Sequence, residues 1–276
     1  MVDDNQRHGG ERRPRPAPGS ASRRGPRTDR ENRWSGPGRT RPAQPRNNPG
    51  DTDRAVPTGP PIPPEVDAKQ LAPDIRRELS TLDRVTADTV ARHLVAAGEL
   101  LDEDPEAALD HARAARARTS RIAAVREAVG IAAYRCGDWA QALAELRAAR
   151  RMGSKSSLFA LIADCERGLG RPERAIELAR SPEAADLGGD DADELRMVAA
   201  GARSDLGQLE QALTVLSTPQ LESGRSGSTA ARLFYAYADI LLALGRDDEA
   251  LHWFLRSAAA DLEGVTDAEE RVSELG

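Results

Sequence analysis

Five short segments of the sequence share one pattern, a tight turn followed by a helix start with an alanine at a fixed place. The clearest is Gly137–Leu143, which reads Gly-Asp-Trp-Ala-Gln-Ala-Leu. Successive alanines of the pattern are 34, 33, 37 and 38 residues apart, at Ala108, Ala142, Ala175, Ala212 and Ala250. A period of about 34 residues that contains two helices is typical of a helical-hairpin repeat. Such units bury their apolar faces by stacking on their neighbours.

Apolar residues at helical spacing predict five helix pairs between these turns. Pro73 suits the first turn of a preceding capping helix over residues 73–82. Thr266 and Glu269 have capping-box spacing and predict a last helix over residues 266–275. Two longer connections, near residues 181–193 and 217–229, fall between pairs. The expected pairs are 87–101 with 105–117, 120–136 with 139–151, 156–169 with 172–179, 193–206 with 209–217, and 229–244 with 247–261.

Residues 1–63 have a different composition from the rest of the chain. They hold 12 of the 18 prolines, 13 arginines, no lysine and 7 acidic residues, a net charge of +6. Since the net charge of the whole chain is −6, the remaining residues carry a net charge of −12. With almost no aliphatic residues, the segment has too little apolar surface to offset the entropy of ordering. The sequence thus predicts a disordered arm over 1–63 and a helical repeat domain over 64–276.

The basic arm admits three interpretations. It could be a solubilising tail, or it could contact the acidic repeat domain of its own chain. It could also touch the phosphates of nucleic acid, with Trp34 stacking on a base, in an RNA- or ribosome-associated adaptor. Interleaved acidic residues make this last interpretation the weaker one. The arginines concerned are Arg12, Arg13, Arg15, Arg23, Arg24, Arg27, Arg30 and Arg33.

Composition also indicates the cellular compartment to expect. Two cysteines in 276 residues exclude a disulfide framework and suit a reducing compartment. No run of about 18 apolar residues is present, so no membrane span is expected. We therefore expect a cytoplasmic protein. Arginine outnumbers lysine by 37 to 2, which we interpret as the codon bias of a GC-rich, bacterial genome.

Over most of residues 86–261 the pattern resembles the tetratricopeptide repeat family. The second repeat carries the resemblance best, with Val129-Gly130 in its first helix, Gly137 in the turn, and Ala142 and Leu146 in its second helix. The first repeat matches least well, since Glu103 stands where a turn glycine is usual. The resemblance implies an all-α, right-handed superhelical solenoid of about five helix-turn-helix repeats with capping helices.

The resemblance also implies a concave groove lined by the first helix of each repeat, which binds a peptide or a partner helix. The lysines and asparagines of the chaperone-binding carboxylate-clamp subfamily are not expected, because no asparagine follows residue 48 and Lys155 is expected in a loop. A basic or amphipathic ligand fits this weakly acidic groove better. Carried over to this sequence, the groove residues are His93, Ala97, Leu100, Glu127, Ile131, Tyr134, Ala160, Asp164, Arg167, Met197, Gly201, Ser204, Tyr235, Asp239 and Leu242.

Side chains with catalytic potential have simpler explanations. His93 and His111 are expected as polar surface or groove residues, because no further ligand lies at metal-binding spacing. Cys136 and Cys165 are expected as small buried hydrophobes. No glycine-rich phosphate loop is present. We expect a non-enzymatic scaffold that binds a protein or peptide, with no cofactor, metal or catalytic residue.

Removing the arm tests its interpretations. If residues 12–46 compete for the acidic domain, deletion of residues 1–63 raises the affinity for a basic peptide at low salt, where charges are least screened. Titration calorimetry of both forms measures this. Equal affinities would contradict the intramolecular contact. The RNA alternative instead requires binding with a steep salt dependence that disappears with the arm.

Overall fold

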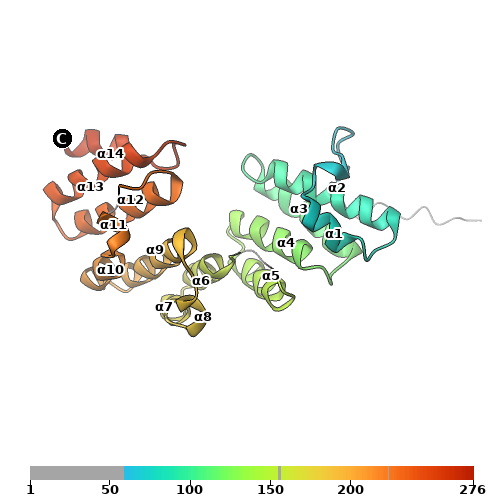
Figure 1. Ribbon diagram of the computed structural model, residues 1–276, viewed down its shortest axis with the longest axis horizontal. Helices are drawn as coiled ribbons and strands as arrows, with labels where there is room; N and C mark the ends of the chain where they lie inside the picture. The colour runs from blue at the N-terminus through green and yellow to red at the C-terminus, as the bar shows by residue number, and fades with distance from the viewer. Residues whose placement is uncertain (1–58, 155–156, 223) are drawn as a thin grey trace, which may run out of the picture. The chain divides into compact units, whose positions relative to one another are not determined.

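The computed structural model describes residues 59–154, 157–222 and 224–276 of the chain (Figure 1). The chain divides into two units, residues 1–53 and 54–276. The first unit, with the eight arginines of the arm, lies wholly outside the described residues, so its function stays a prediction. All the regular elements in the described part of the second unit are helices, and no strand is present there.

Five helical hairpins follow one another along the chain, which confirms the expected all-α repeat (Figure 1). Within each hairpin the two helices pack together, and the second helix also packs on the first helix of the next hairpin. The hairpins are α2 (Arg84–Leu100) with α3 (Pro105–Arg118), α4 (Ala123–Arg135) with α5 (Trp139–Arg151), α6 (Phe159–Gly168) with α7 (Pro172–Ala179), α9 (Gly189–Asp205) with α10 (Leu209–Leu216), and α12 (Ser228–Ala243) with α13 (Asp247–Ala260).

The residues that define the repeat occupy the places that the pattern predicts. Ala108, Ala142, Ala175, Ala212 and Ala250 are each 0% exposed, at the contact between the two helices of their hairpins. A small residue there lets the helix axes approach closely. The turn glycines have φ between +70° and +73°, which a side chain would disfavour. They are Gly137, Gly170, Gly207 and Gly245.

Shorter elements flank and connect the hairpins. They are the 3-10 helix η1 (Ala68–Gln70) and the helices α1 (Pro73–Leu79), α8 (Pro182–Ala185), α11 (Pro219–Glu222) and α14 (Ala268–Leu275). Contacts of the helical region begin upstream of residue 64, since Ile62 packs with Val66 on α2 and the Pro63 carbonyl accepts a hydrogen bond from Arg92.

Two local expectations were wrong. The segment 181–193 is not an open connection, because α8 lies in it and α9 begins at Gly189; the Ser181 hydroxyl accepts a hydrogen bond from the Ala184 amide and starts α8. Thr266 does not cap the last helix. Its amide and hydroxyl both donate to the Asp261 carboxylate, and α14 starts two residues later, at Ala268.

An arginine–carboxylate pair joins each consecutive pair of hairpins. Three of the four carboxylates are buried, with Glu145 4%, Glu166 3% and Asp193 0% exposed. A buried charge that loses its partner is strongly destabilising, so these pairs fix each junction in one arrangement. The pairs are Arg116–Glu145 (α3 to α5), Arg147–Glu166 (α5 to α6), Arg167–Asp205 (α6 to α9) and Arg225–Asp193 (the segment before α12 to α9).

Two helical glycines should respond oppositely to alanine. A Cβ on Gly130 of α4 would lie 2.7 Å from the buried Leu146 side chain and 3.1 Å from its backbone nitrogen, whereas a Cβ on Gly98 of α2 would meet nothing within 4 Å. Gly130→Ala should therefore lower the free energy of unfolding by about 1–3 kcal/mol. Gly98→Ala should raise it by up to about 1 kcal/mol, because alanine favours the helix. Urea denaturation measures both, and two changes of the same sign would contradict this description of the crossing.

Candidate functional site

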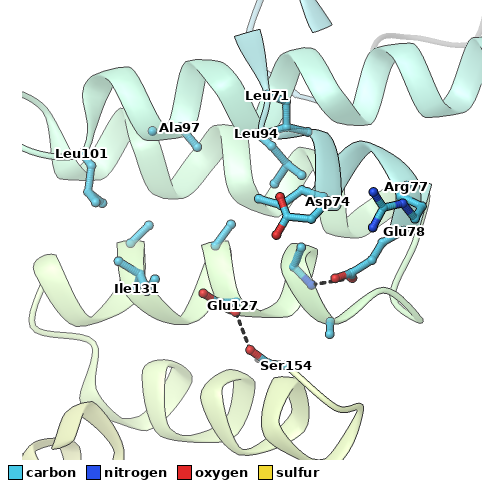
Figure 2. Close-up of a pocket in the computed structure, with 16 residues that line it drawn as sticks. Leu71, Asp74, Arg77, Glu78, Leu94, Ala97, Leu101, Glu127, Ile131 and Ser154 are labelled. Atoms are coloured by element: carbon cyan, nitrogen blue, oxygen red, sulfur yellow. Dashed lines mark hydrogen bonds between the residues drawn. The ribbon is translucent and has the colours of Figure 1, made fainter. Parts of the chain in front are cut away.

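A groove with a volume of about 500 Å³ opens between α1, α2 and α4. Figure 2 shows its lining side chains, with Leu94, Ala97 and Leu101 on the α2 side and Ile131 on the α4 side. Most of the lining is aliphatic, and charged groups stand among it. The lining residues are Leu71, Asp74, Ile75, Arg77, Glu78, Leu94, Ala97, Gly98, Leu101, Ala123, Ala124, Glu127, Ala128, Ile131, Ala132 and Ser154.

Helix α1 closes the groove on one side because its apolar face is anchored in the core of the first hairpin. Leu79 is 2% exposed and belongs to a buried cluster with Val90, Leu94 and Val125. The Glu78 carboxylate accepts a hydrogen bond of 3.3 Å from the Ala124 amide, in the first turn of α4. The capping helix expected from the sequence is therefore also a wall of the groove.

Three of the fifteen predicted groove residues, Ala97, Glu127 and Ile131, line this groove. The Ser154 hydroxyl donates a hydrogen bond of 2.7 Å to the Glu127 carboxylate, which holds that side chain at the edge between α4 and the end of α5 (Figure 2). On α2, the lining positions are 94, 97, 98 and 101, one residue out of phase with the predicted 93, 97 and 100. A shift of one residue rotates the expected face by about 100°.

His93 is consequently not a groove residue. It is 3% exposed, and its Nδ1 lies 3.0 Å from Nδ1 of His111, itself 4% exposed. At that distance one ring nitrogen donates its hydrogen to the other, so the accepting ring is neutral. The prediction that both histidines are surface or groove residues was wrong, because helical spacing alone does not distinguish the groove face from the face toward α3.

The structure brings together three predicted groove residues, Tyr134, Asp164 and Arg167. They bind one another and do not line the groove. The Tyr134 hydroxyl donates to Asp164 Oδ2 at 2.6 Å, and Arg167 Nη1 donates to Asp164 Oδ1 at 2.8 Å. Arg167 also donates to both carboxylate oxygens of Asp205, at 2.8 and 3.2 Å. This chain links α4, α6 and α9. A Cβ on Gly201 would lie 2.7 Å from Arg167 Cζ, so glycine leaves room for the guanidinium.

The environment of this polar chain changes the acidity of its phenol. Burial, and then the hydrogen bond to Asp164, raise the pKa of Tyr134 well above its ordinary value. The hydroxyl therefore keeps its proton and acts as a hydrogen-bond donor at physiological pH. It is suited to holding Asp164 in place and not to accepting a proton.

Three further predicted groove residues, Met197, Tyr235 and Asp239, do not line the α1/α2/α4 groove. Met197 packs on the core of α10, α12 and α13, and Tyr235 lies edge-on to Phe254 with ring centroids 5.1 Å apart. Burial raises the pKa of Tyr235 to about 12, and a hydrogen bond with Asp267 adds to this. Asp239 is exposed and lies 3.8 Å from Arg271. Tyr235 lines a separate, open hollow that includes Arg232 and Thr266.

The cysteines are packing residues, as expected. Cys165 is fully buried, and burial raises the pKa of its thiol to about 12, which disfavours the nucleophilic thiolate. Cys136 is partly buried, and its thiol donates to the Pro105 carbonyl at 3.2 Å. Within the described ranges, His, Cys, Asp and Glu form no group of three or more able to hold a metal ion.

Sequence reasoning missed the contribution of α1. No groove residue was expected on the capping helix, yet Asp74, Arg77 and Glu78 all line the groove. Their spacing of three and four residues places them on one face of a helix, which is the signal that was available. In the part of the chain that the structure describes, no helix is long and apolar enough to span a bilayer.

The buried histidine pair predicts a pH-dependent stability. Burial, with the charges of His111, Arg118 and Arg92, lowers the pKa of His93 to about 4, and burial lowers that of His111 although Asp110 opposes the shift. The unfolded chain therefore binds protons first as the pH falls below about 6.5, and His93 alone lowers the free energy of unfolding from there toward pH 4, by at most about 1.4 kcal/mol per pH unit. The lowered pKa of His111 acts in the same direction.

Urea denaturation between pH 7 and 4.5 measures this decrease. Carboxylates titrate in the same range, so the comparison is with the double variant His93→Gln, His111→Gln, which retains hydrogen-bonding groups and does not titrate. Stability should fall more steeply with acid in the wild type. If the free energy of unfolding has the same pH dependence in the wild type and in the double variant, the pair does not resist protonation.

No protein-family model matches the sequence, and no match was found among curated proteins. Among solved structures, the chain is similar to the crystal structure of YrrB, a TPR protein with an unusual peptide-binding site. The identity is 17% and the TM-score 0.43, over 72% of this chain and 97% of that chain. From its own stacked hairpins, buried repeat alanines and turn glycines, this chain has a tetratricopeptide-like fold.

Proposed function

We propose that the protein is a non-enzymatic interaction scaffold that holds a peptide or a helical segment of a partner protein in the α1/α2/α4 groove. The observation that carries this proposal is the groove itself, a largely aliphatic hollow of about 500 Å³ that is open to solvent. Binding sites for organic ligands typically span about 300–1,000 Å³ and combine apolar walls with a few polar groups.

The energetics of such a groove favour association. Leu71, Ile75, Leu101 and Ile131 are only partly buried, so a partner that covers them removes further apolar surface from water. Each square ångström of apolar surface removed contributes about 25 cal/mol. The few polar groups at the edge then give orientation, since an apolar slot alone discriminates poorly between partners.

The proposal needs no chemical step. The lining contains neither histidine nor cysteine, and its polar side chains are three carboxylates, one guanidinium and the Ser154 hydroxyl. Two of the carboxylates accept hydrogen bonds from the protein, from Ala124 and from Ser154, which suits a fixed binding surface.

The predicted groove residues outside the α1/α2/α4 groove have other roles in this proposal. Tyr134, Asp164 and Arg167 would hold neighbouring first helices in place, because their hydrogen bonds to one another and to Asp205 connect α4, α6 and α9. Met197, Tyr235 and Asp239 belong to the C-terminal hairpins and are not among the described residues that line the groove.

A tryptophan in the groove tests the proposal. Ala128 lines the groove and is partly buried, whereas Ala140 of α5 is exposed and lies outside it. Peptide-display selection on the full-length chain should enrich sequences that bind the wild type and Ala140→Trp, but that lose about tenfold or more in affinity for Ala128→Trp, about 1.4 kcal/mol. Circular dichroism and urea denaturation check that both variants are folded.

Enriched peptides that bind all three forms equally would place the binding surface elsewhere and contradict the proposal. Failure to enrich any peptide on the wild type would contradict it as well.

A further inference from the structure

The groove is built from helices whose backbone groups are already bonded within each helix. An extended peptide needs partners for its own amides and carbonyls, and a helical wall offers them only through side chains. The sixteen lining residues include no asparagine or glutamine that could pair with both kinds of backbone group. A helix satisfies its own backbone and needs only side-chain contacts, so the walls favour a helical occupant.

The small residues of the walls leave space for such a helix. Ala97 and Gly98 on α2 face the groove, as do Ala124 and Ala128 on α4. A Cβ on Gly98 would meet nothing within 4 Å, which shows that this part of the wall is open. Packed helices approach to axis distances of about 8–10 Å, and small side chains at the contact favour the closer value.

The charges around the opening are mostly negative. Among the described residues that line the groove, Asp74, Glu78 and Glu127 are the acidic side chains and Arg77 is the one guanidinium. Figure 2 shows the Asp74 carboxylate directed from α1 toward α4, where Glu127 lies. Carboxylates of two different elements thus border the same apolar surface. A cationic group beside an apolar stripe would be attracted to that edge, whereas an anionic group would be repelled.

We propose that the occupant of the groove is an amphipathic helix of a partner protein whose apolar stripe is bordered by lysine or arginine. This inference rests on the proposed function, because it names the class of partner for the same groove. The apolar stripe covers the aliphatic walls, and the flanking cations lie beside Asp74 and Glu127. Glu127 keeps its hydrogen bond from Ser154, which fixes the carboxylate toward the opening.

Three labelled peptides of about 18 residues, long enough to form a helix in isolation, provide the probes. The first has one leucine and alanine stripe flanked by lysines. The second has the same stripe flanked by glutamates, and the third is the lysine peptide with a central proline, which breaks the helix. Fluorescence anisotropy with the full-length chain at low and physiological salt measures their affinities.

The lysine peptide should bind at least about tenfold more tightly than either of the other two, since each tenfold corresponds to about 1.4 kcal/mol. Neutralising the edge with Asp74→Asn, Glu127→Gln should reduce the preference for lysine over glutamate to within about threefold. The matched control Asp247→Asn, Asp248→Asn removes the same charge from exposed positions of α13, outside the groove, and should retain the preference.

The outcomes distinguish a failure of the inferred basic, helical partner from a failure of the proposed scaffold function. If lysine and glutamate peptides bind equally, or if the α13 control abolishes the preference as fully as the groove variant, the inference of a basic partner is overturned while a groove-dependent scaffold stands. If the proline peptide binds as well as its helical parent, the helical occupant is overturned. If no peptide binds and display on Ala128→Trp also shows no groove-dependent ligand, the proposed function itself falls.

Discussion

The close contact of paired helices at five buried alanines is the constraint on which the rest of the structure depends. Each of these residues is 0% exposed, and each lies in the second helix of its hairpin. A larger side chain would push the axes apart, and the displacement would pass to the next hairpin through the junction that the second helix makes. The groove exists because this spacing is kept while α2 and α4, which belong to consecutive hairpins, leave space between them.

Much of this arrangement could be predicted from the sequence because it is locally determined. Glycine in the turn and alanine five residues later mark four of the five hairpins, and the positive φ of Gly137 and Gly245 follows from the turn geometry. Asp104 and Asp138 accept hydrogen bonds from Ala107 and Gln141 as helix N-caps, again over a few residues.

The groove residues were harder to predict because they depend on helix rotation. On α4 the predicted Glu127 and Ile131 line the groove, but on α2 the expected face was rotated by one residue, so His93 was assigned to the groove and Leu94 was not. The burial of His93 includes its contact with His111, which lies 18 residues away in sequence on α3. Single-sequence spacing carries no information on such contacts.

The ionic junctions have a consequence for how the chain can be divided. Glu145, Glu166 and Asp205 receive arginines from the preceding hairpin, and Asp193 receives one from the segment that leads into the following hairpin. A fragment cut between hairpins would remove one arginine from each buried carboxylate and leave it only the arginine of its own hairpin, which is Arg126 for Glu145, Arg171 for Glu166 and Arg196 for Asp193. A hairpin duplicated or borrowed from another protein would likewise arrive without the matching arginine across the junction. The units are alike in shape but not exchangeable, so this repeat array behaves as a fixed series and not as a set of interchangeable modules.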